Sequence, residues 1–386
     1  MRTLFARLLI CAPLFLLLSP AYADLSNIRI NGFGQVVGAT TLSNDHSEQG
    51  YGADPKFDQE SLYALQISAP LTSKMTATAQ LVGRGSEDFK PKFAWAYVNY
   101  QFDDNWSVKA GQQRIPTFYF SETLDVGVSY PWLRPPTAIY GLASGVSNFD
   151  AITVSYSNQW GKLRIEPQAS YGQWSGPVNF GGNTVHLTDT QFTVLSMTAT
   201  YDDWVTFRTN YLSWKASLTG TPLDGLVAGL NSAGLNTAAN DLAINNDTFS
   251  VIEVGTEINY AKWQVIAEYD YARTFHSFYP QSHVGYIAIG RHFGRFEPMF
   301  TYVRSNNSSP GQPINDIPNT PDNQQFRAIV GGLIKSQTTA ENYYMFDLRY
   351  DLANNVALKF SYTAFNSSIA GTASSNLLSA GVAYSF

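Results

Sequence analysis

Cysteine is almost absent from this sequence, and charged residues and long apolar runs are scarce. The single cysteine, Cys11, lies in an N-terminal apolar stretch, so the rest of the chain can form no disulfide and offers no thiol chemistry. Only 14% of the residues are charged, whereas soluble domains usually have about 25%. After the N-terminal stretch, no segment approaches the run of about 18 apolar residues that marks a membrane-spanning helix. These shortages together exclude a disulfide scaffold and a helical membrane protein.

The first 23 residues have the features of a secretory signal. Arg2 and Arg7 make a positive start, Leu8 to Leu18 form an apolar run, and Ala21-Tyr22-Ala23 is a small-x-small cleavage site. The apolar run is shorter than the roughly 20 residues that a spanning helix needs. We therefore predict a signal peptide at residues 1–23 and a single domain at residues 24–386.

The charge balance is mildly acidic. The whole chain has 24 Lys and Arg against 30 Asp and Glu, a net charge of −6. Without Arg2 and Arg7, 22 basic residues remain against the same 30 acids, which gives −8. An acidic chain repels phosphate backbones, so we expect no nucleic-acid partner.

Aromatic residues are abundant, and the end of the chain shows how they are arranged. The sequence has 24 Phe, 23 Tyr and 8 Trp. In Asn376–Phe386, the apolar residues Leu378, Val382, Tyr384 and Phe386 alternate with small or polar ones. A period of two indicates a β-strand with one apolar face. Bacterial outer-membrane barrels commonly close on such a strand with a terminal aromatic residue.

The same alternation recurs along the chain and predicts sixteen strands. They are Ile28–Leu42, Ser61–Leu71, Met75–Gly85, Lys92–Phe102, Trp106–Thr117, Ala151–Gln159, Lys162–Trp174, Gln191–Tyr201, Trp204–Leu218, Asp247–Ala261, Lys262–Phe275, Ser282–Phe293, Arg295–Asn306, Asn342–Leu352, Val356–Ser368 and Asn376–Phe386. Short turns alternate with long connections, as in an antiparallel up-and-down barrel in a membrane. We predict an all-β transmembrane barrel, with a secreted soluble β-protein as the alternative. The run Ile329–Gln337, in the long connection 307–341, could be a loop helix or an extra strand.

The signal peptide, the sixteen alternating strands, the long third external connection and the terminal Phe386 together resemble the Gram-negative porin superfamily. This resemblance covers residues 24–386. It implies a channel in the outer membrane, surrounded by lipid and assembled as a homotrimer. It also implies that the third external loop, here Phe118–Asp150, folds into the barrel and narrows the pore. This loop departs from the acid-rich loops of general porins because it carries mainly aromatic residues and prolines.

The resemblance and the strand parity together give a set of candidate pore residues. Charges facing lipid cost about 2–4 kcal/mol at the membrane midplane, so charged residues of the strands should face the lumen. We expect Arg114 to turn inward and to pair with Glu122 or Asp125 of the loop. The candidates for lining the pore and its constriction are Arg114, Glu122, Asp125, Tyr130, Trp132, Arg134, Glu166, Glu253, Glu268, Asp270, Asp347, Arg349 and Lys359.

The aromatic residues allow more than one interpretation. Trp106, Trp160, Trp204 and Trp263 lie at or beside short turns, where an interfacial girdle is expected. The rings in the middle of the third loop cannot belong to that girdle. They either pack the loop against the barrel wall or contact a passing solute.

Two classes of function remain open. The first is a channel for passive diffusion of ions and small hydrophilic solutes. We expect it to prefer cations weakly, because acids predominate at mid-height on the predicted lumen wall. The second is a receptor or adhesin whose external loops bind a partner. The sequence contains no catalytic or metal-binding motif, so we expect no enzyme, metal site or cofactor.

Overall fold

The computed structural model describes residues 27–42, 48–141, 147–180, 183–274, 279–367 and 376–386. The predicted signal peptide lies outside these residues. The strands are β1 (Arg29–Thr41), β2 (Leu62–Pro70), β3 (Met75–Arg84), β4 (Pro91–Gln101), β5 (Trp106–Arg114), β6 (Asn148–Tyr156), β7 (Asn158–Trp160), β8 (Leu163–Gln173), β9 (Gly176–Phe180), β10 (Asn183–Tyr201), β11 (Val205–Thr219), β12 (Asp247–Tyr260), β13 (Trp263–Thr274), β14 (Gln281–Arg291), β15 (Phe296–Ser308), β16 (Thr339–Ala353), β17 (Val356–Ser367) and β18 (Asn376–Ser385). The helices are α1 (Thr137–Tyr140), α2 (Asp224–Ser232), α3 (Asn236–Leu242), α4 (Gln312–Asn315) and α5 (Gln324–Gln337), with short 3₁₀ turns η3 (Gly85–Glu87), η4 (Gly127–Ser129) and η6 (Pro321–Asn323).

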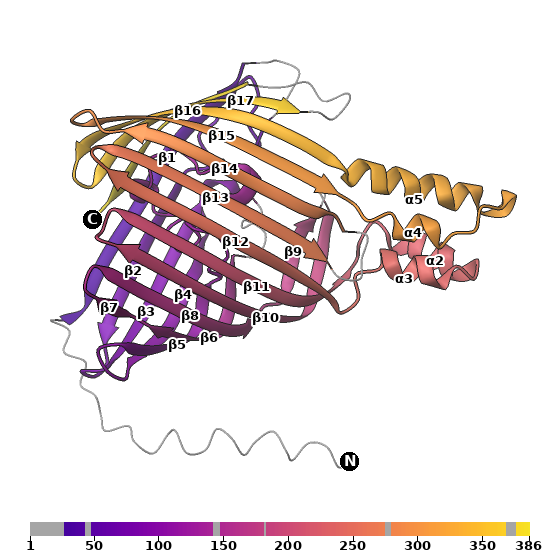
Figure 1. The fold of residues 1–386 in the computed structure, drawn as a ribbon, viewed down its shortest axis with the longest axis horizontal. Coiled ribbons are helices and arrows are strands. Elements are labelled where there is room, and N and C mark those ends of the chain that lie inside the picture. Colours follow the sequence, from indigo (N-terminus) through magenta and orange to yellow (C-terminus); the bar gives the residue numbers. More distant parts are fainter. Residues whose placement is uncertain (1–26, 43–47, 142–146, 181–182, 275–278, 368–375) are drawn as a thin grey trace, which may run out of the picture.

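These strands form one closed antiparallel barrel (Figure 1). β6 and β7 both pair with β8, and β8 and β9 both pair with β10, so each of these pairs is one interrupted strand. The described residues therefore contain sixteen barrel strands, which confirms the predicted fold. All sixteen predicted strands are present, with bounds that mostly differ by a few residues; β10 is the exception, because it begins at Asn183 and not at Gln191.

The first and last strands close the barrel. β1 pairs with β18 from Phe33–Ser385 to Thr41–Leu377. At the end of this seam, the backbone of Gly32 exchanges two hydrogen bonds with Phe386, of 2.9 and 2.8 Å. A Cβ on Gly32 would lie 2.2 Å from the Phe386 ring, so the absence of a side chain at Gly32 lets the terminal ring lie against the first strand.

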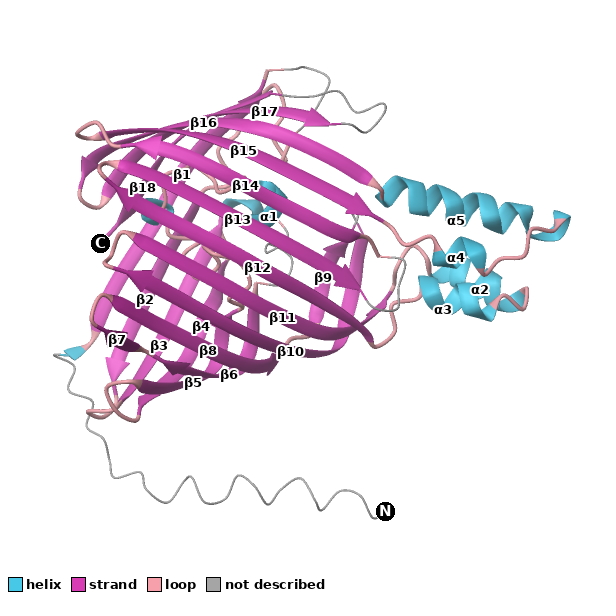
Figure 2. Cartoon of the chain, viewed as in Figure 1, coloured by secondary structure: helices cyan, strands magenta, loops and turns pink. Residues whose placement is uncertain are grey.

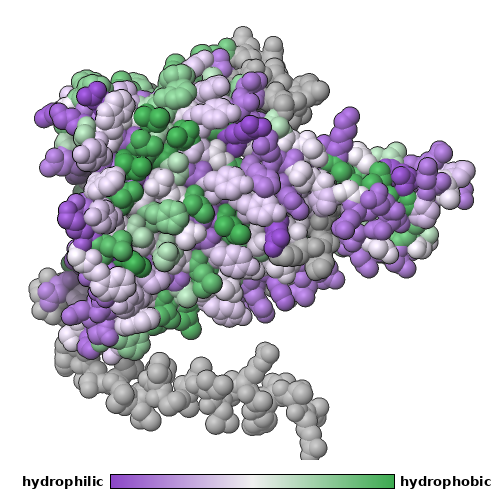
Figure 3. Space-filling model, viewed as in Figure 1, coloured by the Kyte–Doolittle hydropathy of each residue, from purple (hydrophilic) through white to green (hydrophobic). Residues whose placement is uncertain are grey.

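Alternate residues of the strands separate an apolar outside from a polar inside. On β16, Tyr344, Phe346 and Leu348 are exposed, whereas Asp347 between them is buried. Figure 3 shows apolar side chains gathered in a belt across the strands, with polar side chains towards both ends. The four tryptophans predicted for the girdle, Trp106, Trp160, Trp204 and Trp263, are also exposed. The outer surface therefore suits a lipid bilayer.

The helices lie outside the barrel wall, apart from α1 (Figure 2). α2, α3, α4 and α5 gather beyond the end of the barrel opposite the C-terminus, around a small core that includes Leu230, Ile317 and Val330. The run 329–337 belongs to α5, so it is a loop helix and not an extra strand. Among the described residues, no helix has both the length and the apolar character needed to cross a membrane.

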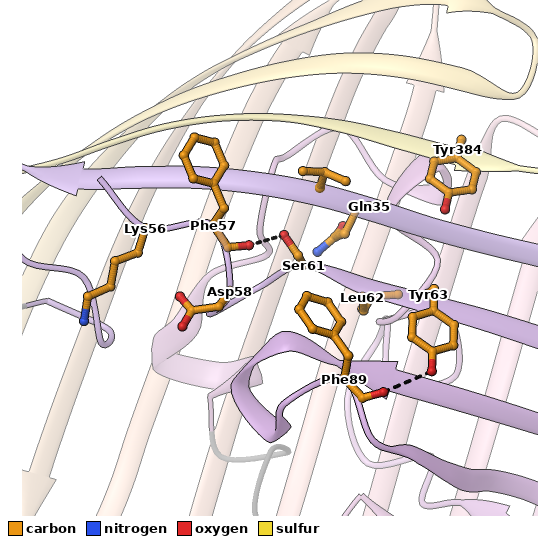
Figure 4. A pocket seen from close by; sticks show the side chains of 10 residues that line it. Gln35, Lys56, Phe57, Asp58, Ser61, Leu62, Tyr63, Phe89 and Tyr384 are labelled. Atoms are coloured by element: carbon orange, nitrogen blue, oxygen red, sulfur yellow. Dashed lines mark hydrogen bonds between the residues drawn. The ribbon is translucent and has the colours of Figure 1, made fainter. Parts of the chain in front are cut away.

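Part of the first external loop pairs with β1 through an antiparallel bridge between Ala39 and Lys56, and a groove lies between this loop, β1, β2 and the β3–β4 connection (Figure 4). The Ser61 hydroxyl donates to the carbonyl of Phe57 over 2.5 Å, and the Tyr63 hydroxyl donates to the carbonyl of Phe89 over 3.0 Å. The rings of Phe57, Tyr63 and Phe89 are all exposed. Apolar rings thus extend the outer surface up to the loops.

Because alternate residues face lipid, a charge introduced on the outer face should destabilise the barrel. Ile287 lies in the middle of β14 and is 46% exposed on the outer face. Replacing Ile287 by Arg should lower the free energy of unfolding by about 2–4 kcal/mol in lipid vesicles, because the guanidinium would face hydrocarbon. The matched control is Gln168→Arg on the inner face of β8, which should leave the free energy of unfolding nearly unchanged. Equal effects of the two variants in denaturant titrations would contradict this orientation.

Candidate functional site

The third external loop, residues 115–147, is the candidate site. It follows β5 and ends where β6 begins at Asn148. The predicted boundary at Asp150 was therefore too late, since Asp150 pairs with Gln173 as part of the sheet. Its residues 142–146 lie outside the described ranges. The contacts described below are made with side chains of the inner barrel wall.

Aromatic rings pack the loop against β14 and β15. The Trp132 side chain is fully buried, and its indole Nε1 donates a hydrogen bond of 2.8 Å to the Thr301 hydroxyl. Its ring contacts Phe120 at 5.6 Å and Tyr286 at 5.7 Å between centroids, both edge to face. Such contacts add to the stabilisation that comes from burying the rings. This arrangement favours packing over solute contact for Trp132, and Tyr130 is buried in the same cluster.

Two basic side chains hold the backbone of the loop on β16 and β17. The Lys359 ammonium is 1% exposed and donates to the carbonyl of Gly127, to that of Tyr130 at 2.7 Å and to that of Trp132 at 2.6 Å. The Arg349 guanidinium donates to the Tyr130 carbonyl at 3.0 Å and also to that of Val128 at 2.8 Å. We call Lys359 and Arg349 the basic latch. Because all five hydrogen bonds go to four carbonyls of the loop, the latch fixes the path of the backbone.

A second set of contacts fixes the loop near β3 and β5. Both carboxylate oxygens of Asp125 accept from Arg84 at 2.7 Å, and Arg114 donates to the same carboxylate. Burial alone would raise the pKa of Asp125, but the charges of Arg114 and Arg84 outweigh it and hold that pKa well below its usual range. Arg114 is buried inside the barrel. Gly111, three residues earlier in β5, has a φ of 130°, which departs from ordinary strand geometry.

The positive charge of Arg134 is compensated by the first external loop. Its Nε donates to Glu60 Oε1 at 2.7 Å, a second guanidinium nitrogen donates to Glu60 Oε2 at 2.5 Å, and that nitrogen also reaches the Ser379 hydroxyl at 2.9 Å. Arg134 therefore ties the third loop to the first loop and to β18. Because the guanidinium is paired and buried, it adds little to the field of an open lumen.

The acidic wall residues lie beneath the loop, which corrects their expected place at an open pore surface. Glu268 accepts hydrogen bonds from the Tyr119 amide at 2.9 Å, the Tyr140 hydroxyl at 2.5 Å and the Tyr286 hydroxyl at 3.0 Å. Three further acids of the inner wall are also buried: Glu253, Asp270 and Asp347. The strand parity is as expected, but the packed loop separates these four carboxylates from water.

The opposite wall remains more accessible. Tyr97 on β4, Lys109 on β5 and Glu166 on β8 face inward and are all partly exposed. The Lys109 ammonium lies 5.6 Å from the centre of the Tyr97 ring. Glu122, in the third loop, has a side chain that is 39% exposed and lies 3.5 Å from Arg208. The third loop is thus packed mainly against β11–β18, with polar groups accessible between the loop and β4–β8.

Several partners of the loop were not among the predicted residues, among them the charged residues Arg84, Arg208 and Glu60. Arg84 continues the inward parity of Thr78 and Gln80 on β3, so its position could have been inferred from the alternation. Glu60 lies between the first external loop and β2 and follows no periodic pattern.

Substitution of Lys359 tests whether the basic latch anchors the third loop. Lys359→Met keeps most of the side-chain volume but removes the donor to three carbonyls. We expect local opening of residues 128–133 to become about 1.5–3 kcal/mol easier, so that their amides exchange roughly 10 to 100 times faster. Hydrogen exchange with mass spectrometry measures this rate. Lys109→Met is the matched control, and equal acceleration in both variants would contradict the latch.

Comparison with known proteins agrees with the barrel fold. No protein-family model and no curated protein sequence matches the chain. Three solved structures are similar in fold: an anion-selective porin from Comamonas acidovorans (12% identity, TM-score 0.59, covering 93% of this chain and 99% of that one), the outer membrane channel DcaP of Acinetobacter baumannii (11%, 0.58, 95% and 99%), and the outer membrane protein OmpT of Vibrio cholerae in a trimer form (11%, 0.56, 93% and 99%). The chain therefore has the fold of the integral sixteen-stranded porins of the bacterial outer membrane.

Proposed function

We propose that the barrel is a water-filled channel for passive diffusion of ions and small hydrophilic solutes across the outer membrane. The observation that carries this proposal is the one-sided packing of the third loop. It buries the acids of β12, β13 and β16, whereas the polar wall of β4–β8 stays partly exposed. Barrels of sixteen strands are wide enough to enclose an aqueous path. The descriptions of DcaP as a channel and of the Comamonas protein as a porin support the same function.

The proposed channel has no enzymatic role. The buried Glu268 is engaged by the loop, and Asp125 is shared between two arginines, so both act in anchoring. We further propose that residues 1–23 are removed as a signal peptide and that the barrel is a homotrimer in outer-membrane lipid. The trimer form of Vibrio cholerae OmpT supports the assembly.

A receptor or adhesin is the second candidate, favoured by the external helices. α2, α3, α4 and α5 extend beyond the barrel and have their own small core. Such a unit could bind a partner with the barrel as its anchor. Ion conductance by the purified protein in a planar bilayer decides between the two, because an anchor need not conduct.

The loop is the proposed constriction, and its removal should widen the path. Replacing residues 131–143 by a short Gly-Ser linker deletes Trp132, Arg134 and α1, which hold the loop in place. We expect a higher single-channel conductance than in the unaltered protein. The matched control replaces residues 226–240 of the external helices by the same linker and should leave conductance unchanged. If conductance stays the same in the loop variant, the loop does not limit ion flow.

We propose a weak preference for cations, supported by the accessible carboxylates and opposed by the accessible Lys109 and Arg164. Glu122 and Glu166 are partly exposed, and Glu166 lies 3.4 Å from Arg164. Because the other wall acids are buried, the net field should be small. Under a tenfold KCl gradient, the reversal potential should show potassium passing slightly more readily than chloride.

Glu122→Gln should move that reversal potential towards chloride, whereas Asp104→Asn, in the exposed turn between β4 and β5, should not change it. Preferential passage of chloride by the unaltered protein would contradict the proposal. A reversal potential near zero would instead favour complete charge pairing along the wall.

A further inference from the structure

β13, β14 and β15 are neighbouring strands of the barrel (Figure 1), and a groove of about 650 Å³ lies across their outer face. At its centre, Gly285 of β14 has no side chain to cover the sheet. Tyr269 of β13 lies directly opposite Gly285 on one side, and Arg304 of β15 lies directly opposite it on the other. Both of these side chains are exposed. Their strands are two strand spacings apart, or about 10 Å, so the groove between them is wide enough for an extended hydrocarbon chain.

The groove is apolar towards the middle of the barrel wall and polar towards the long-loop end. Ile287 follows Gly285 in the direction of the short turn, and Ala267 and Tyr302 lie opposite Ile287 on the two neighbouring strands. His283 precedes Gly285 in the direction of the long connection, and Asn306 lies opposite His283. A lipid has the same order of parts, with its chains towards the middle of the membrane and its headgroup at the membrane surface.

Arg304 supplies an unpaired positive charge at the polar end of the groove. Among the described residues, its guanidinium has no partner in an ion pair, a hydrogen bond or a ring contact. The His283 Nδ1 lies 2.7 Å from the Tyr269 hydroxyl. When that hydroxyl donates, His283 carries its proton on Nε2 and can donate it to an anion. Together with the Asn306 amide, β14 and β15 therefore present three donors at this end.

The acidic residue that borders the groove does not oppose an anion there. Among the described lining residues, Glu268 is the only acid. Its backbone carbonyl is the part that faces the groove, 3.1 Å from the position that a Cβ on Gly285 would take. Its carboxylate points into the barrel, where it accepts hydrogen bonds from Tyr119 and Tyr140 of the third loop. The charge on the groove side is therefore positive.

We propose that this groove binds a phosphate-bearing lipid of the leaflet at the long-loop end. The phosphate lies at Arg304, because the planar guanidinium offers paired donors that match phosphate oxygens. One acyl chain lies over Gly285 and continues past Ile287. A neutral lipid would leave the guanidinium without a partner, and a cationic lipid would meet charge of its own sign. The site does not depend on whether the barrel conducts ions.

The hollow at Gly285 distinguishes this site from an ordinary arginine at a membrane surface. Long basic side chains near the end of a spanning segment reach towards the headgroups in general. Here a groove for the chain lies directly beside the guanidinium, so the headgroup and the chain of one lipid molecule are held together. Both the charge and the groove should therefore contribute to binding.

Dioleoyl phosphatidic acid is the probe, and native mass spectrometry of the purified protein in detergent counts the lipids that bind. Three matched compounds separate the contributions of its parts. Dioleoylglycerol lacks the phosphate, inorganic phosphate lacks the chains, and a dioleoyl trimethylammonium lipid has the opposite charge. We expect phosphatidic acid to bind about tenfold more tightly than each of the three.

Two arginine variants test the headgroup contact. Arg304→Gln should weaken the binding of phosphatidic acid about tenfold, whereas Arg304→Lys keeps the charge and should retain most of it. The matched control is Arg291→Gln, which removes an exposed guanidinium at the short-turn end of β14, 5.0 Å from the centre of the Trp263 ring. This control should bind phosphatidic acid normally. Equal weakening in Arg304→Gln and Arg291→Gln would overturn the site, because any surface arginine would then serve.

Two further variants test the groove. Gly285→Leu fills it and should weaken the binding of phosphatidic acid several-fold. Because a Cβ at this position comes close to the Glu268 carbonyl, Ala267→Leu serves as a second variant that narrows the groove from β13. Ala110→Leu, at an exposed position on β5, is the control and should bind normally. Normal binding by both groove variants would overturn the place proposed for the chain.

The matched compounds and the assembly state give the remaining outcomes. Equal binding of dioleoylglycerol and phosphatidic acid would overturn the role of the phosphate. Equal binding of inorganic phosphate would show a site for a free anion and would overturn the lipid. Binding of phosphatidic acid by separated monomers but not by the assembled protein would show that a second copy of the chain covers the groove, which would also overturn the proposal.

Discussion

Backbone groups in hydrocarbon have no water to bond with, so a sheet in a membrane must have no open edge. In this chain the last edge is closed by the seam between β1 and β18, and Gly32 admits the terminal Phe386 ring there. Closure fixes which alternate residues face lipid and which face the interior. The rest of the structure depends on this separation of lipid-facing from interior-facing residues. It also determines that the charged side chains that bind the third loop point into the barrel.

Inside the barrel, the loop replaces water as the partner of buried charges. Lys359 donates to carbonyls of the loop, and Glu268 accepts from its amide and hydroxyl groups. Leaving either group unpaired in the interior would be costly, so these contacts favour one position of the loop. The same contacts convert an acidic wall into a packed surface and move the accessible path to the side of β4–β8. Selectivity of the channel should therefore depend on few charges.

The strands and their parity could be read from the sequence because the period of two is local. The alternation assigns Asp347 and Lys359 to the inner face for this reason, and both are buried. That the third loop covers these two residues could not be predicted from the sequence. The contact between Lys359 and the Gly127 carbonyl joins positions that are 232 residues apart in the chain. The groove at Gly285 depends on strand register as well as parity, and most external helices follow no clear periodic signal.

The central claim is that the loop covers one inner wall and leaves the other open to water. The only cysteine lies in the predicted signal peptide, so single cysteines can be introduced without background. The most direct measurement compares the rates at which a charged, water-soluble thiol reagent modifies Gln168→Cys on β8 and Ser361→Cys on β17. The account predicts fast modification at position 168, with a change in current, and very slow modification at position 361. Equal rates at both positions would contradict it.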